Sequence, residues 1–490
     1  MGPAAAPRGL LKDQDPLVRE YAADALGRIG NASQGVVDAL SAAVTDENPQ
    51  VRAEAVNALL SLDIDSETRI ALVVDVLNDA DPSVVAPALN TIAEYAKAGT
   101  PTLITALENP KSRYWGCLIA AEMGPRAKHA VSALEKAAKD QYPEIRMEAL
   151  LALGAIGPDA SEALSTVTAA LNDKSPAVQY AAMYALGEIR DSSSAPTIAK
   201  YLDSQDVMLR ELSAWALARV NPDDTEARQR ALTTLVESLE SDNPAVRGGA
   251  ARALTDFPEQ SGEFAEALSS LLADKDYTVV ANAIQTLSSF GEPVVPVLVE
   301  ALGHPDRRLA AVATLQRIGP KAAVAAVPMI EAVGVADDPR LRQEVSYAIA
   351  SIGPAAADAT GQLVMLLGDS DPQVVYSAIY ALGKIGPPAN SAVPKLEGNL
   401  GSEDQFLRLF SVWALLKIEP NNEKIIQKAI PLLTEALSQL QGLGRIEAAI
   451  ALGEIGPAAK SAAPALREAE GDANPAVRDA ATKALEKIGS

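Results

Sequence analysis

Apolar residues recur at spacings of three and four along residues 13–30 (DQDPLVREYAADALGRIG), which predicts one helix with a single buried stripe. The stripe consists of Val18, Ala22, Ala25, Leu26 and Ile29. Asp15 is the expected N-cap, Pro16 is tolerated in the first turn, and Gly30 is expected to end the helix. This stretch therefore carries its own start and stop signals.

The same pattern returns along the whole chain, and most steps between copies are 33 residues. Its proline, or the residue in the place of the proline, stands at positions 16, 49, 82, 110, 143, 176, 207, 244, 277, 305, 339, 372, 405, 442 and 475. Between successive copies lies a second apolar stretch, often opened by a pair such as Gly353-Pro354. A repeat of this length is the mark of a solenoid. We therefore predict an all-α protein, an α-solenoid of about 15 two-helix repeats.

A fuller motif can be read at the two ends of the chain. The pattern Asp-x-x-Pro-x-Val-Arg-x-x-Ala-Ala-x-Ala-Leu-Gly-x-Ile-Gly is almost complete at residues 13–30 and again at 472–489. In this pattern the chain resembles HEAT repeats, particularly the bacterial bilin-lyase-like subclass, over its whole length. The resemblance implies a superhelix in which the first helix of each repeat lies on the convex side. The second helix, which begins at the proline, would line the concave side.

An uninterrupted repeat favours one elongated domain, residues 1–490, over several separate ones. The steps between prolines are 33, 28, 33, 33, 31 and 37 residues from position 49, and 33, 28, 34, 33, 33 and 37 from position 244. Side chains match as well: Tyr180 with Tyr376, Tyr184 with Tyr380, and Trp215 with Trp413. We predict that two six-repeat blocks, residues 49–243 and 244–441, arose by tandem duplication.

An arginine recurs three residues after the proline in most repeats, as at Arg19, Arg146 and Arg247. We expect it to pair with the aspartate of the preceding turn and to tie each inter-helix loop to the next. Because it recurs regardless of the local surface chemistry, we interpret it as structural.

The charge balance limits the classes of partner. Lysine and arginine number 42 and aspartate and glutamate 64, a net charge of −22 that disfavours nucleic acid and anionic membrane surfaces. No run of 18 apolar residues is present, so we expect no membrane insertion. Cys117 is the single cysteine, which we interpret as a small buried hydrophobe. The lack of a secretory signal favours the cytoplasm, whereas an upstream signal, if one was removed, would place the protein outside it.

Catalytic chemistry has little support. His129 and His304 are 175 residues apart and neither has metal-ligand spacing to another histidine or cysteine. We found no glycine-rich phosphate loop and no nucleophile elbow. The sequence therefore predicts a protein that is not an enzyme, with no catalytic residue, metal site or cofactor.

The candidate site is a set of aromatic residues on the concave face. The eighth residue after the proline varies widely in chemistry between repeats, which is typical of a surface position, and in several repeats it is tyrosine or tryptophan. The predicted partner-binding residues are Tyr347, Tyr376, Tyr380, Phe410 and Trp413 in the second block and Tyr180, Tyr184 and Trp215 in the first. Exposed aromatic clusters anchor protein interfaces. The alternative is that these rings fill space between adjacent inner helices.

These observations predict a non-catalytic scaffold or adaptor that grips a protein or an extended peptide on its concave face. Two alternatives stay open. The resemblance itself implies a bilin lyase or another chromophore-handling protein, which mixing with a bilin and recording the absorption spectrum would reveal. A structural spacer or assembly subunit would bind instead through its ends or convex side. The terminal repeats show no obvious polar cap, so self-association through the solenoid ends is also kept open.

Overall fold

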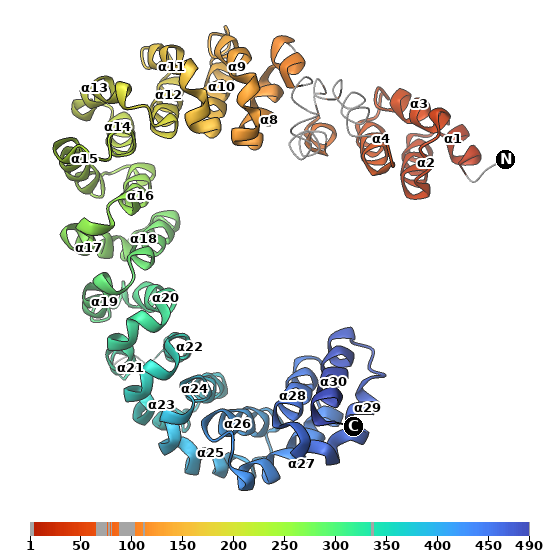
Figure 1. Cartoon of the computed structure of the whole chain (residues 1–490), viewed down its shortest axis with the longest axis vertical. Coiled ribbons are helices and arrows are strands. Elements are labelled where there is room, and N and C mark those ends of the chain that lie inside the picture. The colour runs from red at the N-terminus through yellow and green to blue at the C-terminus, as the bar shows by residue number, and fades with distance from the viewer. Residues whose placement is uncertain are drawn as a thin grey trace. The chain divides into compact units, whose positions relative to one another are not determined.

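The structure is a computed structural model that describes residues 4–64, 76, 79, 81–87, 103–110, 113–334 and 338–489. Every regular element in these ranges is helical (Figure 1). Contacts divide the chain into two compact units, Met1–Ser241 and Asp242–Ser490. The division lies two residues before the start of the predicted second block at residue 244, and the duplication itself stays a prediction.

The first unit alternates inner helices, which begin at or near the repeat proline or the residue in its place, with outer helices that are mostly shorter. Its α-helices are α1 (Ala5–Leu10), α2 (Pro16–Ile29), α3 (Gln34–Ala43), α4 (Pro49–Ser61), α8 (Arg113–Met123), α9 (Val131–Ala137), α10 (Pro143–Ile156), α11 (Leu164–Ala170), α12 (Pro176–Ile189), α13 (Ala195–Ile198), α14 (Val207–Val220) and α15 (Thr225–Ser238). The helix predicted from position 82 is described over residues 82–87, and the outer stretch before it, residues 65–75, lies outside the described residues.

The second unit continues the same alternation. Its α-helices are α16 (Pro244–Ala253), α17 (Ser261–Ser270), α18 (Tyr277–Phe290), α19 (Val295–Ala301), α20 (Arg308–Ile318), α21 (Ala326–Val333), α22 (Pro339–Ile352), α23 (Thr360–Leu366), α24 (Pro372–Ile385), α25 (Val393–Asn399), α26 (Gln405–Ile418), α27 (Glu423–Gln439), α28 (Leu443–Ile455), α29 (Ala463–Ala469) and α30 (Pro475–Ile488). Within this unit the even-numbered helices pack against one another in series and form the inner layer, and the odd-numbered helices form the outer layer (Figure 1).

The inner helices begin and end where the local sequence predicts. The Asp15 carboxylate accepts a hydrogen bond from the Leu17 backbone N–H at 2.9 Å, and α2 runs from Pro16 to Ile29. Gly30 follows with a φ of 65°, a left-handed conformation that suits glycine. The predicted start and stop of this helix are therefore confirmed, whereas the predicted stripe is buried only in part: Ala22 and Leu26 are buried, Val18 and Ala25 are half-buried, and Ile29 is 37% exposed.

The outer helices differ from the expectation of one continuous helix after Gly-Pro. At Gly353-Pro354 the chain first makes a 3-10 segment, η11 (Gly353–Ala359), and only then the α-helix α23. Ala356 interrupts the helical geometry with φ and ψ of −90° and 19°. Gly353 itself has a φ of 69°, so glycine is required where the chain turns from the inner layer to the outer.

The recurrent arginine forms a ladder, with a partner other than the predicted one. Nε and Nη2 of Arg146 each donate to the Asp173 carboxylate at 2.8 Å, across 27 residues. Its Nη1 donates to the backbone carbonyls of Asp140 and Gln141 in the preceding turn. The prediction that the acid belongs to the preceding turn is wrong, because that turn supplies carbonyls and the next turn supplies the carboxylate. Other arginine–aspartate pairs with this spacing are Arg19–Asp46, Arg52–Asp79, Arg113–Asp140, Arg247–Asp274, Arg342–Asp369 and Arg445–Asp472, and in the Arg408–Glu435 pair a glutamate takes the place of the aspartate.

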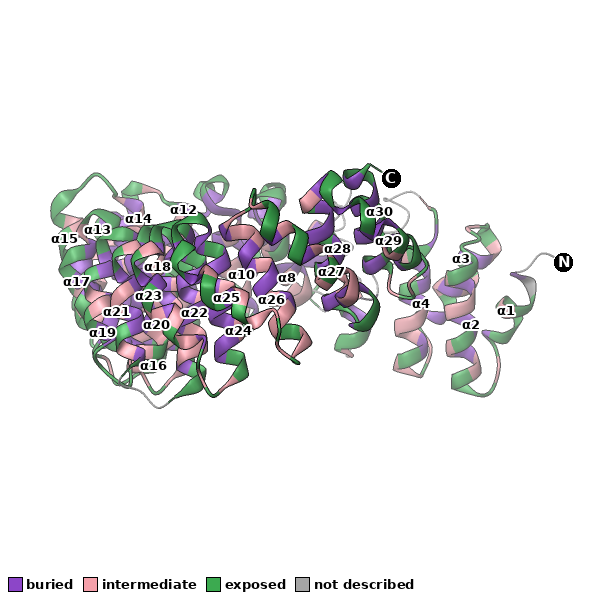
Figure 2. Cartoon of the chain, turned by 90° about the horizontal axis from the view of Figure 1, so that it is seen from below, coloured by how far each residue is buried: buried purple, intermediate pink, exposed green. Residues whose placement is uncertain are grey.

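Buried residues recur along the helices of both layers (Figure 2), and alanine is the commonest of the buried apolar residues. Cys117 is fully buried, and burial raises the pKa of its thiol to about 12. It therefore packs as the small hydrophobe that the sequence predicts.

The final helix, α30, presents polar side chains on the face that in other repeats packs against the next inner helix. Arg478, Thr482 and Glu486 are all exposed there. Glu486 occupies the same position in its repeat as Gly383 does in α24, and Gly383 lies against the next inner helix at Trp413. The expectation of terminal repeats without a polar cap is therefore wrong for α30.

Candidate partner-binding surface

All eight predicted binding residues lie on inner helices, and none of them is buried. We call Tyr180 and Tyr184 of α12 with Trp215 of α14 the first strip. The second strip consists of Tyr347 on α22, Tyr376 and Tyr380 on α24, and Phe410 and Trp413 on α26. Each strip runs across successive inner helices within one unit.

Within each strip the rings bridge neighbouring helices. Tyr184 stacks on Trp215 with ring centroids 5.3 Å apart and planes 4° apart. The matching pair in the second strip, Tyr380 and Trp413, stacks at 5.4 Å and 12°. The rings therefore fill space between inner helices, as the alternative interpretation expected. They also remain partly accessible to solvent, as the 36% exposure of Tyr184 shows.

The second strip holds two further ring contacts. Tyr347 meets Tyr380 edge to face at 6.1 Å, and Tyr376 meets Phe410 at 5.5 Å. Such pairs are worth about 0.5–1.5 kcal/mol beyond their burial. The strip therefore consists of two groups of contacting rings, Tyr347 with Tyr380 and Trp413, and Tyr376 with Phe410.

A glycine on the preceding helix makes room for each tryptophan. A Cβ added at Gly187 would lie 2.5 Å from the Trp215 ring, and one at Gly383 would collide with the Trp413 ring. Both glycines stand in the last turn of a helix, α12 or α24, where they still have helical neighbours on both sides and glycine is less favourable than alanine. Each indole ring can therefore pack against the preceding helix only because glycine leaves room for it there.

We expect Gly383→Ala to lower the stability of the second unit by about 1 kcal/mol, because overpacking the indole costs more than the gain in helix propensity. The urea midpoint of the full chain and its near-ultraviolet circular dichroism would report the change. Gly361→Ala on α23 is the matched control, since no atom lies within 4 Å of a Cβ built there, and it should not destabilise. An unchanged tryptophan signal in Gly383→Ala would contradict the proposed seat.

Two of the tyrosines also replace the arginine of the ladder. Residues 179 and 375 are glutamine and valine where other repeats carry arginine. The Tyr180 hydroxyl donates to Asp206 at 2.7 Å, and the Tyr376 hydroxyl donates to Asp404 at 2.5 Å. The hydrogen bond to Asp206, together with burial, raises the pKa of Tyr180 to about 12. These two hydroxyls are therefore engaged within the stack, and their rings are what a partner would meet.

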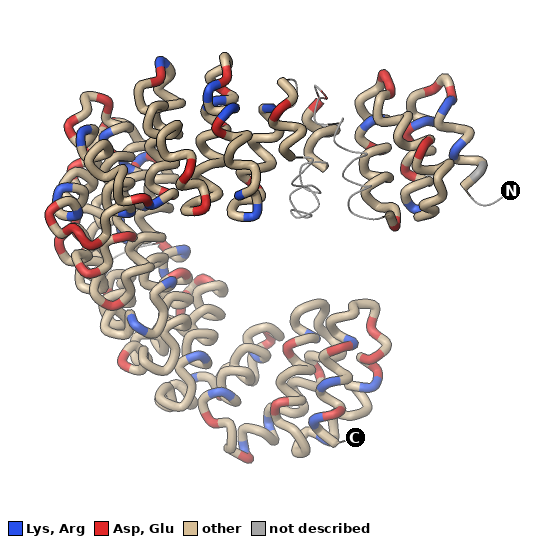
Figure 3. The backbone as a smooth tube through the Cα atoms, turned by 45° about the horizontal axis from the view of Figure 1, so that its top comes forward, with Lys and Arg blue, Asp and Glu red and all other residues tan. Residues whose placement is uncertain are grey.

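The charges beside the two strips differ. In the first strip, Arg219 lies 5.0 Å above the Trp215 ring and pairs with Glu188 at 3.0 Å. In the second, Lys384 lies 5.3 Å above the Tyr380 ring. Figure 3 shows that lysines and arginines are interspersed with acidic residues along both units, so these differences are local.

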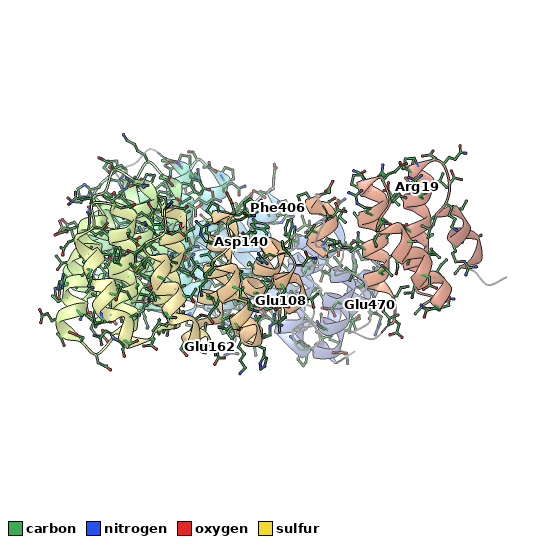
Figure 4. All side chains as sticks on the ribbon, turned by 90° about the horizontal axis from the view of Figure 1, so that it is seen from above. Arg19, Glu108, Asp140, Glu162, Phe406 and Glu470 are labelled. Carbon is green, nitrogen blue, oxygen red and sulfur yellow. The ribbon has the colours of Figure 1, made fainter. Side chains whose placement is uncertain are left out.

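Three exposed apolar residues extend the second strip and were missed from the sequence. Phe406 of α26 is 48% exposed (labelled in Figure 4), and Leu443 and Ile450 of α28 are 76% and 41% exposed. Ile450 occupies the eighth position, but its aliphatic side chain did not distinguish it from a core residue. Phe406 and Leu443 are the residues immediately after the first position of their repeats. At this position the apolar periodicity does not predict whether a side chain is exposed or buried.

We searched the described residues for metal-binding groups of side chains and for helices that could span a membrane. These residues contain no group of three or more histidine, cysteine, aspartate or glutamate side chains placed to hold a metal ion. His129 and His304 are both exposed. No helix among the described residues combines the length and apolar character needed to cross a membrane.

One open depression of about 510 Å³ lies on the outer helix α27 and includes no residue of the second strip. Its lining residues carry no acid, base or thiol: Gln427, Ile430, Pro431, Thr434 and Ser461. Nothing in this lining favours the chromophore-handling alternative.

Paired helices stacked in two layers, with the repeat proline opening each inner helix, define an α-solenoid. The family model for HEAT repeats matches residues 8–93, 100–174, 164–245, 232–316, 326–416 and 430–490. The chain therefore belongs to the HEAT-repeat proteins, and the predicted fold is confirmed. No curated protein matches it in sequence.

Solved structures with a similar fold include solenoids of the importin-β type. The Kap95p structure with RanGDP has a TM-score of 0.55 at 13% identity, over 99% of this chain and 84% of that chain. The Kap95:Nup1 complex gives 0.58 at 14% identity, over 99% and 72%. Yeast importin-β (Kap95p) gives 0.55 at 15% identity, over 99% and 73%. At these identities the similarity establishes the fold.

Proposed function

We propose that this chain is a non-catalytic scaffold that binds a partner protein on its inner helices, with the second strip as a principal site. The observation that carries the proposal is that five aromatic side chains on α22, α24 and α26 stay partly exposed while contacting one another across the helices. Alanine and leucine suffice for packing in other repeats. The rings therefore add exposed apolar area that packing between the helices does not require.

The energetics of interfaces support this assignment. Partly exposed tyrosine and tryptophan rings bury a large area at a small cost in conformational entropy. Because the rings of the second strip are already held by stacking, little side-chain freedom remains to be lost on binding. Similar solenoids also bind proteins, since Kap95p forms a complex with Nup1 and binds RanGDP.

The test is affinity capture from candidate host lysates with the native chain and a Tyr380→Ala, Trp413→Ala double variant of equal helicity. We expect the native chain to retain a protein that the variant loses, because truncating one central anchor costs on the order of 2 kcal/mol of binding. The released protein would then be identified and its affinity for both chains measured.

A second double variant controls for the loss of apolar surface. Val324 and Met365 are 74% and 72% exposed on the outer layer, so Val324→Ala, Met365→Ala removes apolar groups away from the strip. This variant should capture the partner as well as the native chain does. Equal capture by all three proteins would reject the second strip and favour a spacer that binds through its ends or convex side.

A further inference from the structure

The exposed apolar surface of the second unit is longer than the aromatic strip alone. Phe406, Leu443 and Ile450 continue it from α26 onto α28. The Lys417 ammonium joins the same two helices, because it lies 2.9 Å from the Glu454 carboxylate of α28. We call the second strip together with Phe406, Leu443 and Ile450 the extended second strip.

The chemistry of this surface suits a helix better than an extended chain. Its eight side chains are aromatic or aliphatic, and none carries an amide. The Tyr376 hydroxyl is already bonded to Asp404. An extended backbone laid on such a surface would leave buried N–H and C=O groups without partners, at a cost of about 1–3 kcal/mol each. A helix satisfies these groups within itself.

The two long edges of the surface differ in charge. Lys384 and Lys417 stand twelve residues after the first residue of the repeat motif, at the C-terminal ends of α24 and α26. At the opposite edge, Asp371 and Asp404 cap the N-termini of the same helices. The helix dipoles add to this polarity, because the last turn favours cations and the first turn favours anions.

The remaining acids of this surface do not cancel the basic edge. Glu344 and Glu447 stand at the fifth position of α22 and α28, roughly 10 Å along the helix axis from the twelfth position. Among the described residues, Lys384 forms no ion pair. Lys417 pairs with Glu454 where both side chains are more than a third exposed, and such a pair is worth at most about 1 kcal/mol. Both ammonium groups can therefore receive a carboxylate from a ligand.

We infer that the extended second strip binds an amphipathic helix whose apolar stripe covers the rings and whose flank carries aspartate or glutamate facing Lys384 and Lys417. This inference rests on the proposed function and names the chemistry of the partner. The first strip provides a contrast, because its basic group, Arg219, pairs with Glu188 at 3.0 Å where the two side chains are only 18% and 25% exposed, whereas the Lys417–Glu454 pair of the second strip is more exposed and Lys384 is in no ion pair among the described residues. We therefore expect only the second strip to select a helix with an acidic flank.

The experiment is selection of a displayed random peptide library against the full chain. We expect enriched sequences with apolar residues at spacings of three and four and acidic residues along one side of that stripe. Binding of the synthesised peptides would then be measured by fluorescence anisotropy with four proteins. These are the native chain, Tyr380→Ala with Trp413→Ala, Lys384→Glu with Lys417→Glu, and Lys395→Glu with Lys460→Glu.

The last variant makes the same change of charge on exposed lysines of the outer layer, on α25 and η13, and should bind like the native chain. The Lys384→Glu, Lys417→Glu variant should bind acidic peptides at least about tenfold more weakly, because like charges then face each other. Peptides that need the aromatic residues but ignore this reversal, or that carry basic flanks, would overturn the inference and leave the proposed function standing. If no enriched peptide depends on Tyr380 and Trp413, both are overturned.

Discussion

Replacing Arg247 with alanine is expected to destabilise the second unit by about 2 kcal/mol, between the values typical of exposed and of buried ion pairs. Its Nε and Nη2 donate to the Asp274 carboxylate at 2.7 and 2.8 Å, and the Asp274 side chain is only 8% exposed. The variant would leave this carboxylate with no guanidinium in a partly desolvated site. Because each repeat contacts mainly its neighbours, the loss should concentrate in α16 to α18.

Hydrogen exchange of the α16 and α18 amides, together with urea denaturation of the full chain, would measure this effect. Arg252→Ala is the matched control, since Arg252 lies on the same helix and is exposed. The control should stay within about 0.5 kcal/mol of the native chain. Equal protection of α18 in both variants would show that the ladder does not hold the repeats together.

Acid should weaken the stack as a whole, because the same ion pair recurs in many repeats. Hydrogen bonding to arginine lowers the pKa of Asp46, Asp173 and Asp274 below the ordinary value of 3.8. A carboxyl whose pKa is depressed by folding contributes stability that is fully present above its unfolded pKa. That contribution is lost as the pH falls through the folded pKa.

We therefore expect the urea midpoint to be nearly independent of these groups between about pH 5 and 8 and to fall steeply below about pH 4. Asp274→Asn should be less stable than the native chain at neutral pH and should lose less on acidification, because one titrating rung is gone. A urea midpoint that stayed constant down to about pH 2.5 would contradict the electrostatic role of the ladder.

The repeat architecture could be predicted from sequence because its signals are local. Asp15, Pro16 and Gly30 set the start and end of α2 through backbone chemistry within one turn. The period of the apolar stripe then predicted the paired helices that the described repeats show. The match of the HEAT-repeat family model over most of the chain agrees with this predicted architecture.

The site was predictable only in part, because it depends on contacts between helices. The eighth position placed Tyr380 and Trp413 on the inner layer, but their stacking depends on the small volume at Gly383, which lies on the facing side of α24. Phe406 and Leu443 lie in the first turns of α26 and α28, so their exposure depends on how these helices begin against their neighbours. The direction of the arginine pairing was missed because a spacing alone does not distinguish the preceding turn from the following one.

Two rungs of the ladder differ from the rest, since Tyr180 and Tyr376 bond to Asp206 and Asp404 without a guanidinium. Added salt screens the attraction between exposed ions but acts little on a phenol hydrogen bond. The hydrogen bonds that Tyr180 and Tyr376 make to Asp206 and Asp404 should therefore depend less on electrolyte than the arginine pairs do. At an ionic strength that weakens the arginine–carboxylate pairs, the hydrogen bonds from Tyr180 to Asp206 and from Tyr376 to Asp404 should persist.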